Sequence, residues 1–288
     1  MRYVIKNEHI SVTVDTLGAE VVSALGADGF EYIWSGEAWN GHAPLLFPFC
    51  GVPLNEKYTL GGVEYPMAKH GFARRSEFTV EEVREDEITL SLSPNEKTRA
   101  MFPFEFKLVA RYTLVADSLT ARFTVENNGD GIMPFIFGWH PAYNLGGEAE
   151  LSKFSVDFMC DGPLTRYSLQ NGPFVCPTPL EFPLDGGKYF LNEKEIYEND
   201  TLILTGARCH VKLSGEGDSH GVDLFYSENL PYFCIWKAPV TEARYLCLEP
   251  WSGTPADGTA IENFDTKPMC RIGKGESESF TYITVFNK

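Results

Sequence analysis

The sequence lacks the marks of several large protein classes. No apolar run is long enough to span a bilayer, and residues 1–14 alternate like a strand, without the apolar core of a secretory signal. Neither a G-x-G-x-x-G nor a Walker-type loop occurs, and no strand–helix–strand rhythm is visible. We therefore expect neither a membrane protein nor a doubly wound nucleotide-binding fold, and predict a cytoplasmic location.

The cysteines lack the spacing of a metal site or a disulfide framework. There are seven, an odd number, and no C-x-x-C occurs. Cys234 and Cys247 stand in apolar, strand-like runs, as buried reduced cysteines do. The sequence thus predicts free thiols, no bound metal and no other cofactor.

Positive charge is also scarce. The 24 Lys and Arg residues face 40 Asp and Glu residues, giving a formal net charge of −16. Nucleic acids and anionic lipids bind to basic surfaces, so neither is an expected partner.

Alternating apolar and polar residues are the main feature of the chain. The pattern has period two in 10–14, 88–93, 106–115, 119–126, 210–214 and 222–227, with Gly, Asn and Asp turns between strands. Aromatic residues make up 14% of the chain, as suits strands and cores. These patterns predict an all-β fold, and we interpret residues 1–288 as one domain, with 160–200 as a loop-rich excursion.

Three segments depart from ordinary strand sequence. Each of them places an ionisable side chain at the end of an apolar run or within a tight turn: Lys69–Arg75, Phe137–Asn144 and Tyr245–Gly253. Together they contain His70, His140 and Glu249, which form an acid–base set. Histidine titrates near neutrality, and a partly buried Glu can have its pKa raised into a useful range.

Each of these residues also has a structural interpretation. His70 is either a turn residue or functional, and Glu249 is either a base or the partner of Arg74, Arg75 or Arg244 in an ion pair. The tryptophans either fill the core or form the apolar surface of a binding site, on which the apolar face of a ligand's ring can stack; they are Trp139, Trp236 and Trp251.

The three segments together resemble the aldose 1-epimerase (galactose mutarotase-like) family, and most closely its LacX-like branch. HGFARRSEF, GWHPAYN and LCLEPWSGTPAD are similar to that branch's elements around its two histidines and its glutamate. APLLFPFCG (43–51) and YFCIWKAP (232–239) resemble two further elements in the same order. The resemblance covers the chain from about Ile10 to the end.

This resemblance implies a large antiparallel β-supersandwich and interconversion of the α and β anomers of a free hexose. Glu249 matches the general base that takes the C1 hydroxyl proton, and His140 matches the acid that protonates the ring oxygen. His70 matches the second histidine, which hydrogen-bonds the sugar. Arg74 and Asp223 are candidates for sugar contacts, with Trp139, Trp236 and Trp251 as aromatic ones.

One departure from the family pattern bears on the substrate. Val52 stands where the LacX-like branch has an arginine that points at the sugar, and Arg74 is the candidate to replace it. A hexose-6-phosphate 1-epimerase is the alternative within the same class; it needs at least two Arg or Lys converging on the site, and Arg74 and Arg75 are available.

A non-catalytic sugar-binding or sensing protein of the same fold is the alternative from another class. A glycosidase would require two carboxylates, and only Glu249 stands out. The expected partner is a small-molecule sugar, and the chain is either a monomer or a homodimer.

Overall fold

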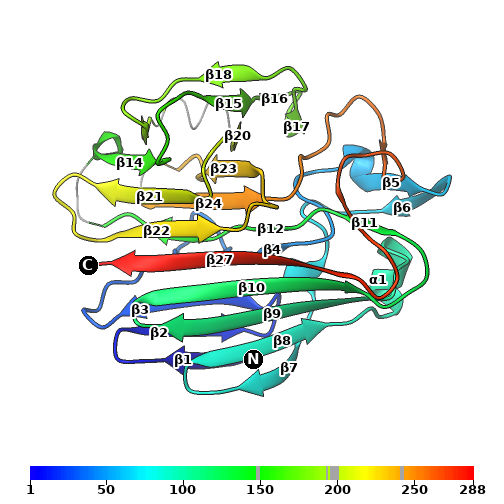
Figure 1. Ribbon diagram of the computed structural model, residues 1–288, viewed down its shortest axis with the longest axis horizontal. Coiled ribbons are helices and arrows are strands. Elements are labelled where there is room, and N and C mark those ends of the chain that lie inside the picture. Colours follow the sequence, from blue (N-terminus) through cyan, green and yellow to red (C-terminus); the bar gives the residue numbers. More distant parts are fainter. Residues whose placement is uncertain (147–149, 193, 195–200, 241–242) are drawn as a thin grey trace.

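Strands dominate the computed structural model, which describes residues 1–146, 150–192, 194, 201–240 and 243–288 (Figure 1). The helices described there are short: α1 Glu96–Met101 and the 3-10 turns η1 Leu54–Glu56, η2 Ala73–Arg75 and η3 Leu151–Lys153. None of the helices in the described ranges has the length and apolar character needed to cross a membrane. The predicted all-β fold is confirmed.

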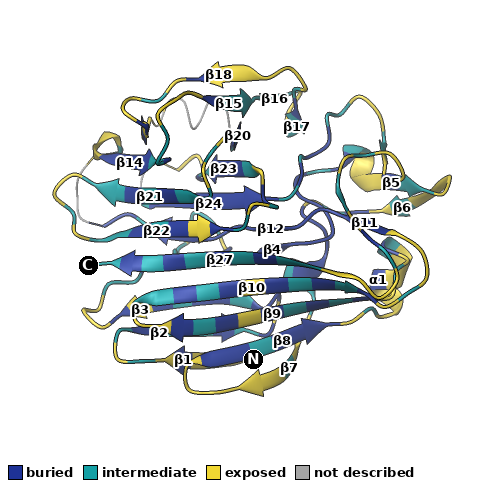
Figure 2. Cartoon of the chain, viewed as in Figure 1, coloured by how far each residue is buried: buried dark blue, intermediate teal, exposed yellow. Residues whose placement is uncertain are grey.

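The larger sheet has nine antiparallel strands among the described residues. In spatial order they are β19 Lys188–Phe190, β14 Phe154–Asp157, β21 His210–Gly215, β22 Gly221–Tyr226, β27 Ser277–Asn287, β10 Ser118–Asn127, β9 Phe106–Val115, β8 Glu87–Leu92 and β7 Thr79–Val83. The strand predicted over 106–115 is confirmed in full, because its alternating residues face the core and the outer surface in turn (Figure 2).

A second antiparallel sheet packs against the first through aromatic side chains and carries the candidate site. Its strands in order are β18 Leu180–Phe182, β15 Leu164–Tyr167, β20 Thr201–Thr205, β23 Tyr232–Trp236, β24 Tyr245–Trp251, β12 Gly138–Trp139 and β4 Leu45–Leu46, with β13 Ala142–Asn144 also paired to β24. The stretch 160–200, expected to be rich in loops, supplies β15 and β18 to this sheet; residues 193 and 195–200 of that stretch lie outside the described residues.

Smaller sheets flank these two. They are β1 Arg2–Lys6 with β2 Ile10–Asp15 and β3 Glu20–Gly26, β11 Met133–Phe135 with β26 Cys270–Ile272, β16 Leu169–Gln170 with β17 Phe174–Val175, and β25 Glu262–Asn263 with β5 Lys57–Leu60 and β6 Val63–Pro66. Of these pairs, β25 with β5 is parallel.

The hydrophobic core fills the space between the two large sheets. Trp139 of β12 packs on Tyr282 of β27 with ring centroids 5.4 Å apart, and the Tyr282 hydroxyl donates to the Pro250 carbonyl at 2.9 Å. Figure 2 shows β24 buried along its whole length. Functional side chains on β24 are therefore held rigidly, on the face turned away from this core.

Candidate active site

Glu249 lies in the middle of the buried strand β24, opposite Cys234 of β23. Side chains on a strand alternate between its two faces, so Leu248 and Pro250 point towards the other sheet when Glu249 points away from it. The fold thereby aims a fully buried carboxyl at a cleft on the outer side of this sheet.

His140 directly follows the short strand β12 and reaches the same point from the neighbouring strand. Its Nε2 lies 3.2 Å from Oε1 of Glu249, and the two side chains are 8% and 1% exposed. The His140 ring stacks on Trp39 with centroids 4.9 Å apart. Neither Glu249 oxygen, nor Nδ1 of His140, has a geometrically satisfied hydrogen bond among the described residues. These three polar atoms can therefore form hydrogen bonds with a ligand.

His70 is held by an unusual backbone turn. Its φ is +63°, and Gly71 follows at +70°. A Cβ on Gly71 would lie 2.1 Å from the Phe47 carbonyl oxygen, so only glycine fits. The Gly51 N–H donates to Nδ1 of His70 at 3.0 Å. Since Nδ1 accepts this bond, the ring proton of neutral His70 sits on Nε2.

The three predicted segments meet around one cleft. Its lining combines an acid–base group, two cations and an aromatic wall, from Trp39, Lys69, His70, Arg74, His140, Thr201, Trp236, Glu249 and Trp251. The ring centroids of His70 and His140 are 5.9 Å apart, and those of His70 and Trp251 are 6.1 Å apart. The fold thus brings together the residues that the sequence picked out in three separate segments.

Burial controls the charge of this cluster. It raises the pKa of the Glu249 carboxyl well above its usual range, with Lys69 as the largest opposing influence. Burial, followed by the positive charge of Arg74, lowers the pKa of His140 well below its usual range. Burial also lowers the pKa of His70, with His140 as the next cause. The protein therefore favours one proton shared by the Glu249–His140 pair over two separate charges.

One group of described residues could in principle ligate a metal ion. The ligand atoms of His140, Cys247 and Glu249 all lie within 4.8 Å of one another, and all three residues are buried. Burial, and then Glu249, raises the pKa of the Cys247 thiol, so the thiol stays protonated at neutral pH when no metal ion is bound.

Two sequence-predicted site residues lie away from the cleft. Trp139 is in the core, where its indole N–H donates to the Ala43 carbonyl at 2.8 Å. Consecutive residues point to opposite sides, so Trp139 turns inward where His140 faces the cleft. Asp223 is in β22 of the other sheet, where it contacts Nε2 of His210 at 2.7 Å and accepts from Asn287 at 2.9 Å. These two assignments are corrected: neither residue is placed to contact a ligand in the cleft.

The remaining assignments can be placed as well. Arg74 lines the cleft, whereas Arg75, the next residue of η2, lines a different pocket. Val52 is half-buried and is not among the described lining residues. Sequence reasoning missed Trp39, Lys69 and Thr201. Trp39 could have been suspected as an aromatic residue in a loop between two glycines, and Lys69 as the lysine directly before His70. The sequence carries no such signal for Thr201.

Comparison with known proteins agrees with this geometry. The family model of aldose 1-epimerase matches residues 1–263. The plasmid-encoded protein LacX of Lactococcus lactis subsp. lactis is 30% identical over 98% of this chain and 99% of its own length. The chain belongs to the aldose 1-epimerase family. Its predicted resemblance to that family, and to the LacX-like branch, is confirmed.

Solved structures related to this aldose 1-epimerase family member share its whole fold. A galactose mutarotase-like protein from Lactobacillus casei ATCC 334 is 28% identical with a TM-score of 0.94, and each chain covers 100% of the other. A galactose mutarotase related enzyme from Lactobacillus acidophilus is 27% identical with a TM-score of 0.92, covering 100% of this chain and 98% of that one. The galactose mutarotase-like architecture therefore extends over the full chain.

Proposed function

We propose that the protein is an aldose 1-epimerase that interconverts the α and β anomers of a free hexose. The observation that carries this proposal is the buried Glu249–His140 pair, 3.2 Å apart, whose carboxyl oxygens have no satisfied hydrogen bond among the described residues. Buried polar groups without partners are costly, so a site that keeps them is suited to a ligand that supplies partners.

In the proposed reaction the Glu249–His140 pair receives one proton from the sugar and gives one proton to it. In the reacting form of the pair, its one shared proton is on Nε2 of His140. The Glu249 carboxylate then takes the proton of the C1 hydroxyl while His140 gives its proton to the ring oxygen. The bond between C1 and the ring oxygen breaks, leaving an open-chain aldehyde. Rotation about C1–C2 exposes the other carbonyl face, and the reverse steps close the ring. The pair's total charge is unchanged, which suits a buried site.

The other lining residues have supporting roles in this proposal. His70 presents its Nε2–H as a neutral donor, because the Gly51 N–H occupies Nδ1. Trp39 and Trp236, with ring centroids 5.3 Å apart and roughly perpendicular, offer apolar surface to the C–H face of a sugar. The LacX-like branch has an arginine that points at the sugar, and this chain has Val52 at that position. In this proposal Arg74 donates the hydrogen bond to the sugar in place of that arginine.

The proposal is tested by anomeric exchange at equilibrium. Proton saturation transfer between the α and β anomeric signals of glucose, galactose, mannose and xylose reports exchange directly. We expect the protein to accelerate exchange for at least one sugar. Binding of these sugars without any gain in exchange rate would favour the non-catalytic sugar-binding alternative.

A hexose-6-phosphate 1-epimerase is the second candidate, and one observation favours it. Two cations, Lys69 and Arg74, line the cleft, in a chain of net charge −16. This meets the requirement for two converging cations, although Lys69 takes the place expected of Arg75. If this candidate is right, glucose 6-phosphate will have the higher kcat/KM, and Lys69→Met will remove that preference while glucose turnover is retained.

We further propose that residues 1–288 act as one domain in the cytoplasm, as a monomer or homodimer. All seven cysteines are free, which agrees with a reducing compartment. The proposed chemistry needs only the sugar and two side chains, so no cofactor is included in it.

A further inference from the structure

Three buried side chains with metal-ligating atoms meet at the cleft. The ligand atoms of His140, Cys247 and Glu249 all lie within 4.8 Å of one another, and all three residues are buried. Cys247 and Glu249 are two positions apart on β24, so both side chains point to the same face of the sheet. His140 directly follows β12, which pairs with β24, and reaches the same face from there. Adjacent strands of a sheet, rather than a loop, therefore fix the positions of the three donors.

The spacing of these atoms suits a tetrahedral zinc ion. Zn–N and Zn–O bonds of about 2.1 Å and a Zn–S bond of about 2.3 Å place neighbouring tetrahedral ligand atoms about 3.4–3.6 Å apart. Nε2 of His140 lies 3.2 Å from Oε1 of Glu249, within about 0.2 Å of that separation. Because no pair of ligand atoms is more than 4.8 Å apart, the Cys247 sulfur has to approach by no more than about 1.2 Å. Rotation of the Cys247 side chain is sufficient for such a shift.

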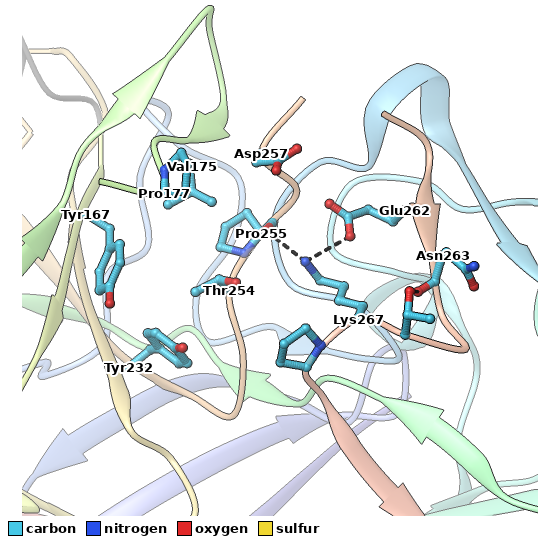
Figure 3. A pocket seen from close by; sticks show the side chains of 12 residues that line it. Tyr167, Val175, Pro177, Tyr232, Thr254, Pro255, Asp257, Glu262, Asn263 and Lys267 are labelled. Carbon is cyan, nitrogen blue, oxygen red and sulfur yellow. Dashed lines mark hydrogen bonds and ion pairs between the residues drawn. The ribbon is translucent and has the colours of Figure 1, made fainter. Parts of the chain in front are cut away.

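The Glu249 carboxyl group has unused capacity to bind a ligand. Its side chain is 1% exposed, and neither of its oxygens has a geometrically satisfied hydrogen bond among the described residues. Glu262, which is 11% exposed, shows the ordinary alternative in a separate cavity of about 410 Å³. Its carboxylate lies 3.0 Å from Nζ of Lys267, as the dashed line in Figure 3 shows. Since buried carboxylates are normally paired or coordinate metals, the two oxygens of Glu249 point to a cationic ligand.

The charges of the donor set match those of a divalent ion. Cys247 binds as a thiolate, Glu249 as a carboxylate and His140 as a neutral imidazole, so the complex with Zn²⁺ carries no net charge, which suits a buried site. The thiol proton and the proton shared by the Glu249–His140 pair leave to solvent. Lys69 and Arg74 also line the cleft and repel a cation. This repulsion favours a metal that bonds strongly to sulfur over Mg²⁺ or Ca²⁺, which prefer oxygen ligands.

We propose that Zn²⁺ binds to His140, Cys247 and Glu249 and thereby inhibits the enzyme. The bound ion occupies the same two side chains that exchange protons with the sugar, so catalysis stops while the metal is present. Zn²⁺ is an inhibitor in this role and not a cofactor, and its fourth coordination position is left to water. The inhibition rests on the proposed epimerase function, whereas the metal binding does not.

Metal binding is measured first, without sugar, by titrating Cd²⁺ and Co²⁺ into the protein. Coordination by a thiolate gives a charge-transfer absorption band, which should saturate at one equivalent of metal and be displaced by Zn²⁺. Cys247→Ala should weaken this binding by about 100-fold or more, since losing even an outer partner of a ligand costs about 10- to 100-fold. Cys234→Ala is the matched control and should bind as wild type, because Cys234 is equally buried and stands opposite Glu249 on β23. Cys247→Ser, which keeps the side-chain size, is the second variant if the alanine variant does not fold.

Inhibition is then measured in the anomeric exchange assay, in buffer freed of metal ions. Zn²⁺ should inhibit wild type and Cys234→Ala, a chelator should restore the rate, and Mg²⁺ should have no effect. Cys247→Ala should keep the metal-free rate and require about 100-fold or more additional Zn²⁺ for the same inhibition.

The outcomes separate this inference from the proposed function. A charge-transfer band of equal strength and affinity in Cys247→Ala, or equal loss of binding in both cysteine variants, would overturn the assigned metal site. Sugar turnover that persists with the metal bound would overturn the inhibition and leave the epimerase proposal standing. If no sugar is turned over in metal-free buffer, the epimerase proposal fails, and the absorption titration alone decides on the metal site.

Discussion

Replacing Gly51 by alanine tests how the fold sets the proton position on His70. Gly51 has a φ of +81°, and an added Cβ would lie 2.5 Å from Cβ and 2.8 Å from Cγ of Pro255. The Pro255 ring is rigid and buried, and its carbonyl is anchored by Lys267 at 3.1 Å. The neighbour therefore cannot move away cheaply, and the backbone N–H that serves His70 must shift.

The size of the effect follows from two contributions. A left-handed conformation costs an alanine roughly 1–2 kcal/mol, and overpacking a rigid neighbour costs a further 1–3 kcal/mol or so. Gly51→Ala should thus lower the free energy of unfolding by roughly 2–5 kcal/mol. Weakening the Gly51–His70 hydrogen bond, worth about 0.5–1.5 kcal/mol, should lower kcat/KM by about 2- to 10-fold.

Gly62→Ala is the matched control. Gly62 has a similar φ of +77°, but nothing lies within 4 Å of its added Cβ. The free energy of unfolding of Gly62→Ala should therefore fall only by the conformational cost of alanine at positive φ, about 1–2 kcal/mol, and the variant should keep full activity. The difference between the two variants isolates the contact with Pro255 and its effect on His70.

The assays are urea unfolding and the pH dependence of kcat/KM. A donor on Nδ1 stabilises neutral His70, so weakening it raises the pKa of His70 and moves the acid limb of the profile to higher pH. Identical unfolding energies and rates for the two variants would refute the packing argument. A destabilised Gly51→Ala with an unshifted acid limb would refute the inferred role of the hydrogen bond.

Three further predictions address the acid–base pair. His140→Asn should lower kcat by about 100-fold or more at unchanged stability, and a wild-type rate would remove His140 from the mechanism. Trp39→Leu uncovers the ring of His140, so its pKa should rise towards the ordinary value in an NMR titration; an unchanged titration would contradict burial as the cause. Folding raises the pKa of Glu249. The Glu249 carboxyl therefore contributes to the free energy of unfolding at pH values below its pKa in the unfolded chain, about 4.3, and this contribution is lost as the pH rises. Glu249→Gln should therefore gain stability relative to wild type between pH 4 and pH 8, and urea unfolding that shows no such gain would argue for a structural ion pair.

The strands were predictable wherever one face is buried and the other is not. The segment 106–115 alternates because β9 packs one face on the core, and the pattern alone located it fully. Alternation also bears on Trp139 and His140, which are neighbours and point to opposite sides. Applied to that pair, the same rule would have placed Trp139 in the core.

Other features depend on contacts that no local pattern records. Asp223 sits on a strand whose sequence does not reveal which of the two large sheets it joins, and that choice puts it away from the cleft. Trp39 reaches His140 from an irregular segment without periodicity. Thr201 comes from β20, which pairs with β23 across a long sequence separation. These residues became visible only when the fold brought distant segments together.

The most direct test of the proposed chemistry is the rate of mutarotation followed by polarimetry after dissolving pure α-D-glucose or α-D-galactose. Wild type, Glu249→Gln and Glu105→Gln are compared with buffer alone, where Glu105 forms an exposed ion pair with Arg99 and serves as the control. The account predicts acceleration by wild type and by Glu105→Gln, and at least a 100-fold lower catalysed rate for Glu249→Gln, roughly the scale for losing a general base. Acceleration by Glu249→Gln equal to that of wild type would contradict it.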